Sequence, residues 1–96
     1  GQENRQMRIV AYERALELDP GHALSYFRYA LQMQADGELA EAERLMLRAI
    51  ALQPMNARFR RAMAEIFGLQ GREADARAEL EKAAAFAPRQ ETEMVD

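Results

Sequence analysis

Few side chains in this chain are of the types that carry out acid–base, nucleophilic or metal chemistry. His22 is the only histidine, and the absence of cysteine excludes a thiolate nucleophile, a disulfide and a cysteine-based metal site. Apart from the tyrosines, the only hydroxyl groups are those of Ser25 and Thr92. His22 directly follows Pro20 and Gly21, a position that favours a turn or the start of a helix over catalysis. The sequence therefore predicts no enzyme and no bound metal or cofactor.

Carboxylates are numerous, but their positions suit helix starts and solvent-facing surfaces. Glu38, Glu41 and Glu43 surround the start of one predicted helix. A second group follows the start of a later one and comprises Glu73, Asp75, Glu79 and Glu81. Negative charges in a first helical turn interact favourably with the helix dipole. No group has metal-ligand spacing and no glycine-rich phosphate loop is present, so we expect these carboxylates to be solvated.

Composition narrows the class of protein further. The chain has 96 residues, of which 49% are hydrophobic and 30% charged, as in a small folded domain or part of one. The net charge of -3 and the absence of a long apolar run argue against nucleic-acid binding and direct membrane insertion. Lys82 is the only lysine among 13 basic residues, a bias that suggests a GC-rich bacterial genome. We expect a soluble protein of the bacterial cytoplasm or periplasm.

The elements that position these side chains repeat along the sequence. The only prolines, Pro20, Pro54 and Pro88, lie 34 residues apart, and proline ends helices because it lacks a backbone donor. Other residue types keep the same period. The paired positions are Ala30 with Ala64, Gly37 with Gly71, Glu41 with Asp75, Ala42 with Ala76, and Ala49 with Ala83. A chance spacing of prolines would not carry these pairs along with it.

Each period contains two predicted helices. In the first helix Tyr26, Tyr29, Ala30 and Met33 follow the spacing of one buried helical face, and Gly37 suits the left-handed conformation at its end. The second helix runs from about residue 39 to Pro54. The same pair recurs over residues 56–69 and 72–86, whereas residues 3–18 form a second helix without its mate.

The sizes of the apolar residues indicate how the helices pack. Small residues, Ala30, Ala42 and Ala49, allow neighbouring helix backbones to approach. Large residues then fill the space beside them, among them Tyr26, Tyr29, Met46 and Leu80.

A 34-residue helix pair with this arrangement resembles the tetratricopeptide repeat (TPR) family. The resemblance implies an all-α, right-handed superhelical α-solenoid of antiparallel helix pairs, with five helices in a single array over residues 1–96. Its predicted parts are residues 3–20 as the second helix of a partial repeat, 22–54 and 56–88 as whole repeats, and 89–96 as a tail or the start of a further helix. Arg8 and Arg60 depart from the family pattern, which has a small residue at the first position and tryptophan at the second.

The resemblance also implies a concave groove lined by the first helices of the repeats. The residues that face it are Leu24, Phe27, Arg28, Leu31, Arg58, Arg61, Ala62 and Glu65. Leu24, Phe27 and Leu31 form a second apolar stripe on helix 22–35, where a surface helix needs only one. This stripe is either ordinary core between repeats or an apolar groove floor edged by arginines, and both interpretations stay open. The groove version suits a partner segment with apolar anchors and acidic flanks.

Two narrower interpretations within helical-repeat families are disfavoured. Some TPR modules hold chaperone tails with a clamp of lysine, asparagine and arginine side chains. Phe27, Leu31 and Ala62 occupy the lysine and asparagine positions here, so the clamp is absent in this register. The RNA-binding pentatricopeptide family has a longer period of about 35 residues and does not suit an acidic chain.

The terminal helices carry apolar residues that lack a partner in the predicted array. The first contains Met7, Ile9, Val10 and Tyr12 with no helix before it. Such ends indicate a segment of a longer array or a chain that pairs with a second copy. We therefore predict a protein-protein interaction scaffold that binds a partner segment in the groove. The alternative is an architectural spacer or a self-associating segment without a groove ligand.

Overall fold

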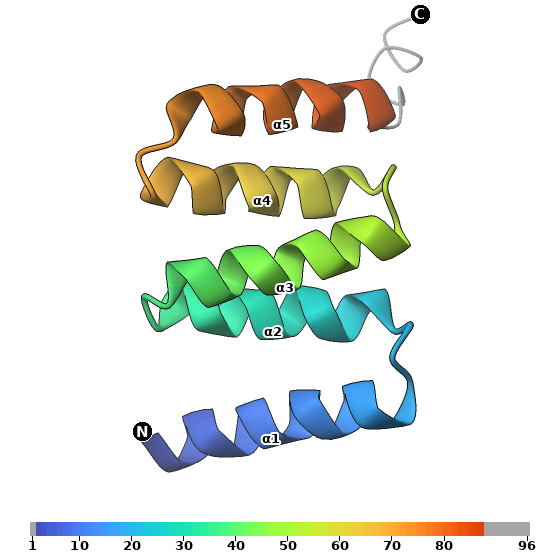
Figure 1. Ribbon diagram of the computed structural model, residues 1–96, viewed down its shortest axis with the longest axis vertical. Coiled ribbons are helices and arrows are strands. Elements are labelled where there is room, and N and C mark those ends of the chain that lie inside the picture. The colour runs from blue at the N-terminus through green and yellow to red at the C-terminus, as the bar shows by residue number, and fades with distance from the viewer. Residues whose placement is uncertain (1, 88–96) are drawn as a thin grey trace, which may run out of the picture.

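The computed structural model describes residues 2–87, and this part of the chain is entirely helical (Figure 1). It contains five α-helices and no strand, which confirms the predicted fold class. The helices are α1 (Gln2–Leu18), α2 (Ala23–Ala35), α3 (Leu39–Leu52), α4 (Ala57–Leu69) and α5 (Glu73–Phe86). Pro88 and the predicted tail, residues 89–96, lie outside the described residues.

The turn inside each helix pair has the same geometry one period apart. Gly37 has a φ of 79° and Gly71 a φ of 77°, in the left-handed region where a side chain is strained. Beyond each glycine the chain closes with the same backbone hydrogen bond, from Glu38 N to Met33 O at 2.8 Å and from Arg72 N to Phe67 O at 2.9 Å. These bonds satisfy carbonyl groups that the helix end leaves free. The recurring glycine is therefore required by the turn.

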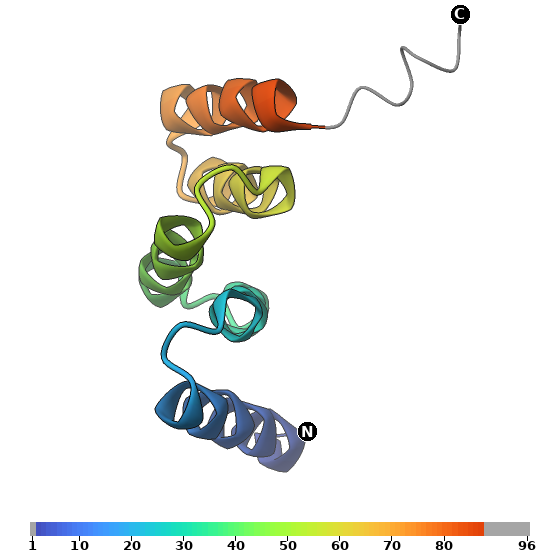
Figure 2. The same ribbon diagram turned by 90° about the vertical axis from the view of Figure 1, so that its right-hand side faces the viewer.

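The helices stack in chain order into an elongated solenoid. The most extensive contacts are those of α2 with α3 and of α4 with α5, and α3 contacts α4 between the two pairs. Viewed along the helices, α2 and α4 lie to one side of α3 (Figure 2). α1 packs mainly on α2. The molecule measures 50 × 31 × 24 Å, so its core is a thin layer that continues from one helix to the next.

Small residues at the helix crossings are fully enclosed, as the sequence predicts. Ala30, Ala42 and Ala49 are each 0% exposed. Close approach of the backbones leaves room for larger side chains beside them. The largest completely buried side chains are Leu45, Met46, Met63 and Ile66.

Two predictions for α5 are wrong. Glu79, expected on a solvated face, is 7% exposed, and Leu80, expected in the core, is 49% exposed. Glu79 turns inward because Arg60 of α4 donates to both of its carboxylate oxygens, at 3.0 and 3.3 Å. Leu80 then projects away from α4. Met46, one period earlier, is buried because α3 has neighbours on both sides, whereas α5 contacts only α4 within the described residues.

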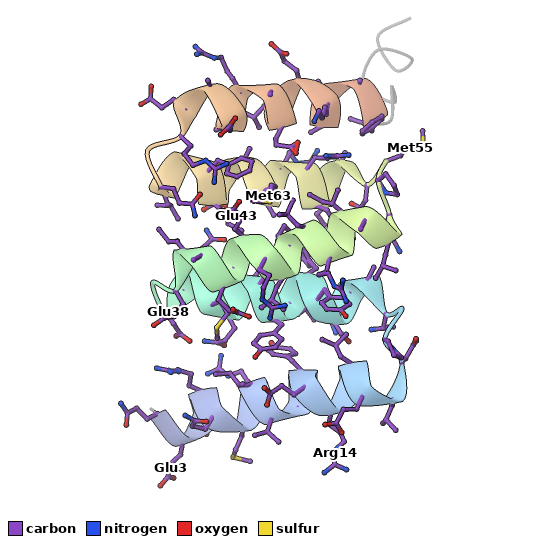
Figure 3. All side chains as sticks on the ribbon, in the orientation of Figure 1. Glu3, Arg14, Glu38, Glu43, Met55 and Met63 are labelled. Atoms are coloured by element: carbon purple, nitrogen blue, oxygen red, sulfur yellow. The ribbon has the colours of Figure 1, made fainter. Side chains whose placement is uncertain are left out.

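Polar contacts also join the two helix pairs. Glu43 of α3 accepts hydrogen bonds from Gln70 Nε2 and Arg72 Nη1, both at 3.0 Å (Figure 3). The Arg72 guanidinium lies 4.3 Å from the centre of the Phe67 ring. This cluster fixes the α4–α5 turn against α3. Glu43 is therefore partly buried, although the sequence suggests that it is solvated.

Candidate protein-binding surface

The predicted groove residues are on α2 and α4, but their exposure differs widely. Arg28, Arg58, Arg61 and Glu65 are exposed. Leu24 is partly buried against the core, and Leu31 is 36% exposed. Phe27 and Ala62 are buried, at 4% and 9% exposure.

Phe27 belongs to the core, because its side chain is 4% exposed and packs between α2 and α4. Its ring stacks on that of Phe59 with the centroids 5.0 Å apart and the planes at 26°. This pair joins α2 directly to α4, the first helices of the two predicted whole repeats. The Arg58 guanidinium lies 4.8 Å from the Phe27 centroid and covers the ring from the solvent side. For this residue the inter-repeat interpretation of the second stripe holds.

The arginines on α2 and α4 fall into two groups. Arg60 has a carboxylate partner, Glu79, at 3.0 Å. Arg28, Arg58 and Arg61 have no carboxylate within 4 Å anywhere in residues 2–87. These three arginines are exposed, and so is Glu65, the one carboxylate among the predicted groove residues. Exposed guanidinium groups can attract and orient carboxylates.

A recess that the sequence did not predict lies where α1, α2 and α3 meet. It has a volume of ≈ 490 Å³, and its lining residues are Glu13, Leu16, Glu17, Tyr26, Tyr29, Arg44, Leu45 and Arg48. Its formation depends on the spacing between α1 and α3, which no local pattern encodes. The only sequence signal is the pair Tyr26 and Tyr29 on one face of a helix.

The pKa of Tyr29, which lines this recess, is shifted by its surroundings. Burial raises the pKa of its phenol, and the charges of Glu13 and Glu41 raise it further. The hydroxyl donates to Glu13 Oε2 at 3.5 Å, and the ring stacks on Tyr12 of α1. Tyr29 therefore stays protonated at neutral pH and links α1 to α2.

His22 occupies the residue before α2, as the sequence predicts for a turn or helix start. Its Nδ1 lies 2.6 Å from Ser25 Oγ, and its side chain does not cap a backbone N–H group. Within residues 2–87 no three histidine, cysteine, aspartate or glutamate side chains come together as a metal site. None of the described helices is both long enough and apolar enough to span a bilayer.

Comparison with known proteins supports the repeat interpretation. Residues 11–44 match the family model of the tetratricopeptide repeat. This segment is similar to a tetratricopeptide repeat. The TPR match begins within α1 and ends within α3. It therefore covers one repeat period whose ends are offset from those of the helix pairs described above. The resemblance that the sequence predicts is thereby confirmed.

Solved structures of MamA have the same fold. A crystal structure of MamA aligns with a TM-score of 0.83 at 22% identity, covering 97% of this chain and 53% of that one. A MamA RS-1 double mutant aligns with a TM-score of 0.81 at 16% identity, covering 86% and 47%. MamA AMB-1 gives 0.79 at 21% identity, covering 88% and 50%.

The chain thus spans about half the length of these MamA structures. No curated protein matches the sequence. At this level of identity the likeness establishes the fold, a helical solenoid of the type that serves protein-interaction scaffolds in general.

Proposed function

We propose that this chain is a protein-interaction scaffold that binds a segment of a partner protein across α2 and α4. It acts within a longer TPR protein or its complex, in the cytoplasm or periplasm of a bacterium. The repeat match and the solenoid fold support the general function. The surface itself supports the choice of α2 and α4.

The observation that carries the proposal is the group of three arginines that have no carboxylate partner within residues 2–87. Arg28 projects from α2, and Arg58 and Arg61 project from α4, on helices that the buried Phe27–Phe59 contact holds together. Exposed arginines attract carboxylates and can bind them through two parallel hydrogen bonds. Leu24 and Leu31 add partly exposed apolar area beside them. The partner segment is therefore an acidic one with apolar anchors.

The same surface has no catalytic group. The histidine and the serine of the described residues meet at the start of α2, where Nδ1 of His22 lies 2.6 Å from Oγ of Ser25. No carboxylate completes a nucleophile–base–acid arrangement with them in the described hydrogen bonds. We therefore propose a non-catalytic role.

A displayed library of random peptides, selected on the immobilised chain, tests the proposal. We expect the selected peptides to share acidic positions that flank an apolar residue. Their binding should fall when Arg28 and Arg61 are both changed to glutamate and persist when Arg77 of α5 is changed in the same way.

The alternative is a spacer or self-associating segment with no ligand on α2 and α4. In that case the selection returns no peptide whose binding depends on Arg28 or Arg61. That outcome would overturn the proposal.

A further inference from the structure

The side of α1 that faces away from α2 carries an exposed apolar stripe with a charge at each end. We define the α1 outer stripe as Glu3, Met7, Val10 and Arg14, which follow one another at i, i+4, i+7 and i+11. Met7 is 69% exposed and Val10 is 55% exposed. Figure 3 shows Glu3 and Arg14 pointing from α1 away from the other helices.

This stripe is separate from the surface that holds α1 in the fold. Ile9 and Leu16 pack against the core on the other side of the helix, and Tyr12 stacks on Tyr29 of α2. α1 is therefore apolar on two sides, although only one is needed to attach it to α2. A shallow depression of ≈ 440 Å³ follows the outer side, lined by Gln6, Met7, Val10, Ala11 and Arg14.

The charges of the stripe indicate what covers it. Glu3 and Arg14 form no ion pair within residues 2–87. Eleven residues span about 16 Å and just over three helical turns, so both charges project in nearly the same direction. One end of the stripe is thus anionic and the other cationic. A parallel copy of α1 would place like charges together, whereas an antiparallel copy places opposite charges together.

One antiparallel alignment of two α1 helices pairs all four residues of the α1 outer stripe. If two copies of α1 cross antiparallel with the two-fold axis between Arg8 and Ile9, Glu3 of each faces Arg14 of the other. Met7 of each then faces Val10 of the other. Both pairings share the same midpoint, as a self-complementary two-fold contact requires.

We propose that the chain self-associates through the α1 outer stripe as an antiparallel two-fold dimer. The contact joins two short helices and is smaller than a standard interface, so the dimer is weak and forms as concentration rises. This contact is distinct from the partner surface on α2 and α4, which stays exposed in both copies.

Charge reversal combined with sedimentation analysis over a concentration series tests the pairing. We expect Glu3→Arg and Arg14→Glu each to raise the dimer dissociation constant roughly tenfold, because each creates two like-charge contacts. The double variant should restore dimerisation to near the original value. Glu81→Arg and Arg77→Glu on α5 give matched changes in net charge and should leave the dissociation constant unchanged.

A second pair of changes tests the apolar part without altering charge. Met7→Gln combined with Val10→Gln should abolish dimerisation while the melting temperature of the monomer stays unchanged, since both side chains are exposed. A chain that remains monomeric up to about 1 mM would overturn the proposal. The α1 outer stripe would then bind a different protein. A dimer that is insensitive to the α1 variants, or one that the double charge reversal does not restore, would also overturn it.

Discussion

Arg60 of α4 and Glu79 of α5 form the most buried ion pair in residues 2–87. Their side chains are 15% and 9% exposed, and Arg60 Nη1 lies 3.0 Å from Glu79 Oε1. Arg60 Nε also donates to the carbonyl oxygen of Pro54 at 3.1 Å. One guanidinium thus connects the turn before α4 to the middle of α5, at a position where the TPR pattern has tryptophan.

Removing one partner of this pair should destabilise the fold. Glu79→Ala leaves Arg60 without its carboxylate in a largely buried site, and we expect a loss of about 2–3 kcal/mol in the free energy of unfolding. Chemical denaturation followed by circular dichroism measures the change. Glu81→Ala on the exposed face of α5 is the control, and it should change stability by less than about 0.5 kcal/mol. Equal effects of the two substitutions would show that the pair contributes nothing.

Phe27 and Leu31 lie on the same helix but should respond differently to truncation. Phe27→Ala removes a buried ring that stacks on Phe59 and should cost about 3–4 kcal/mol, whereas Leu31→Ala should cost less than about 1 kcal/mol. Equilibrium denaturation distinguishes the two. If Phe27→Ala unfolds the chain, Phe27→Leu supplies a milder comparison at about 1 kcal/mol. If Phe27→Ala were as stable as the original chain, Phe27 would belong to the binding surface and not to the core.

Two nearby glycines should give opposite results when changed to alanine. Gly71 has a φ of 77°, so Gly71→Ala should destabilise the fold by about 1 kcal/mol. Gly68 lies inside α4 with nothing within 4 Å of an added Cβ, so Gly68→Ala should stabilise it by about 0.5 kcal/mol. Thermal melting of both variants beside the original chain tests this. The same sign for both would contradict the assigned turn.

Tyr29 should titrate above the ordinary tyrosine pKa of 10.0, because burial and then Glu13 favour its neutral form. A raised folded-state pKa means that its contribution to stability is present below the unfolded pKa and is lost as pH rises through the folded value. An NMR titration of the Tyr29 ring measures the shift. Glu13→Gln should lower the pKa of Tyr29 toward 10.0, and a value at or below 10.0 in the original chain would contradict the described packing.

The sequence was most informative where local chemistry determines structure. Gly37 and Gly71 mark turns that need positive φ, and the alanines at the helix crossings must be small, so periodicity alone predicts the helices and much of the core. It was least informative where the burial of a residue depends on a neighbouring helix. Phe27 lies on the second apolar stripe of its helix, and only the position of α4 decides that it is buried.

The same limit explains the errors on α5. Glu79 is indistinguishable from other helix carboxylates in the sequence, because its burial depends on Arg60 of another helix. Leu80 follows the apolar period but lacks a second neighbouring helix in the described chain. The recess at Tyr29 likewise depends on the spacing between α1 and α3.

On the proposed function, the arginines of α2 and α4 that lack a carboxylate partner within residues 2–87 bind an acidic segment of a partner. The most direct measurement is calorimetric titration of one selected peptide into the original chain and into the Arg28→Glu/Arg61→Glu double variant, with Arg77→Glu as the control. We expect affinity to fall about tenfold or more in the double variant, while its melting temperature and the control's affinity stay unchanged. Equal affinity for all three proteins would contradict it.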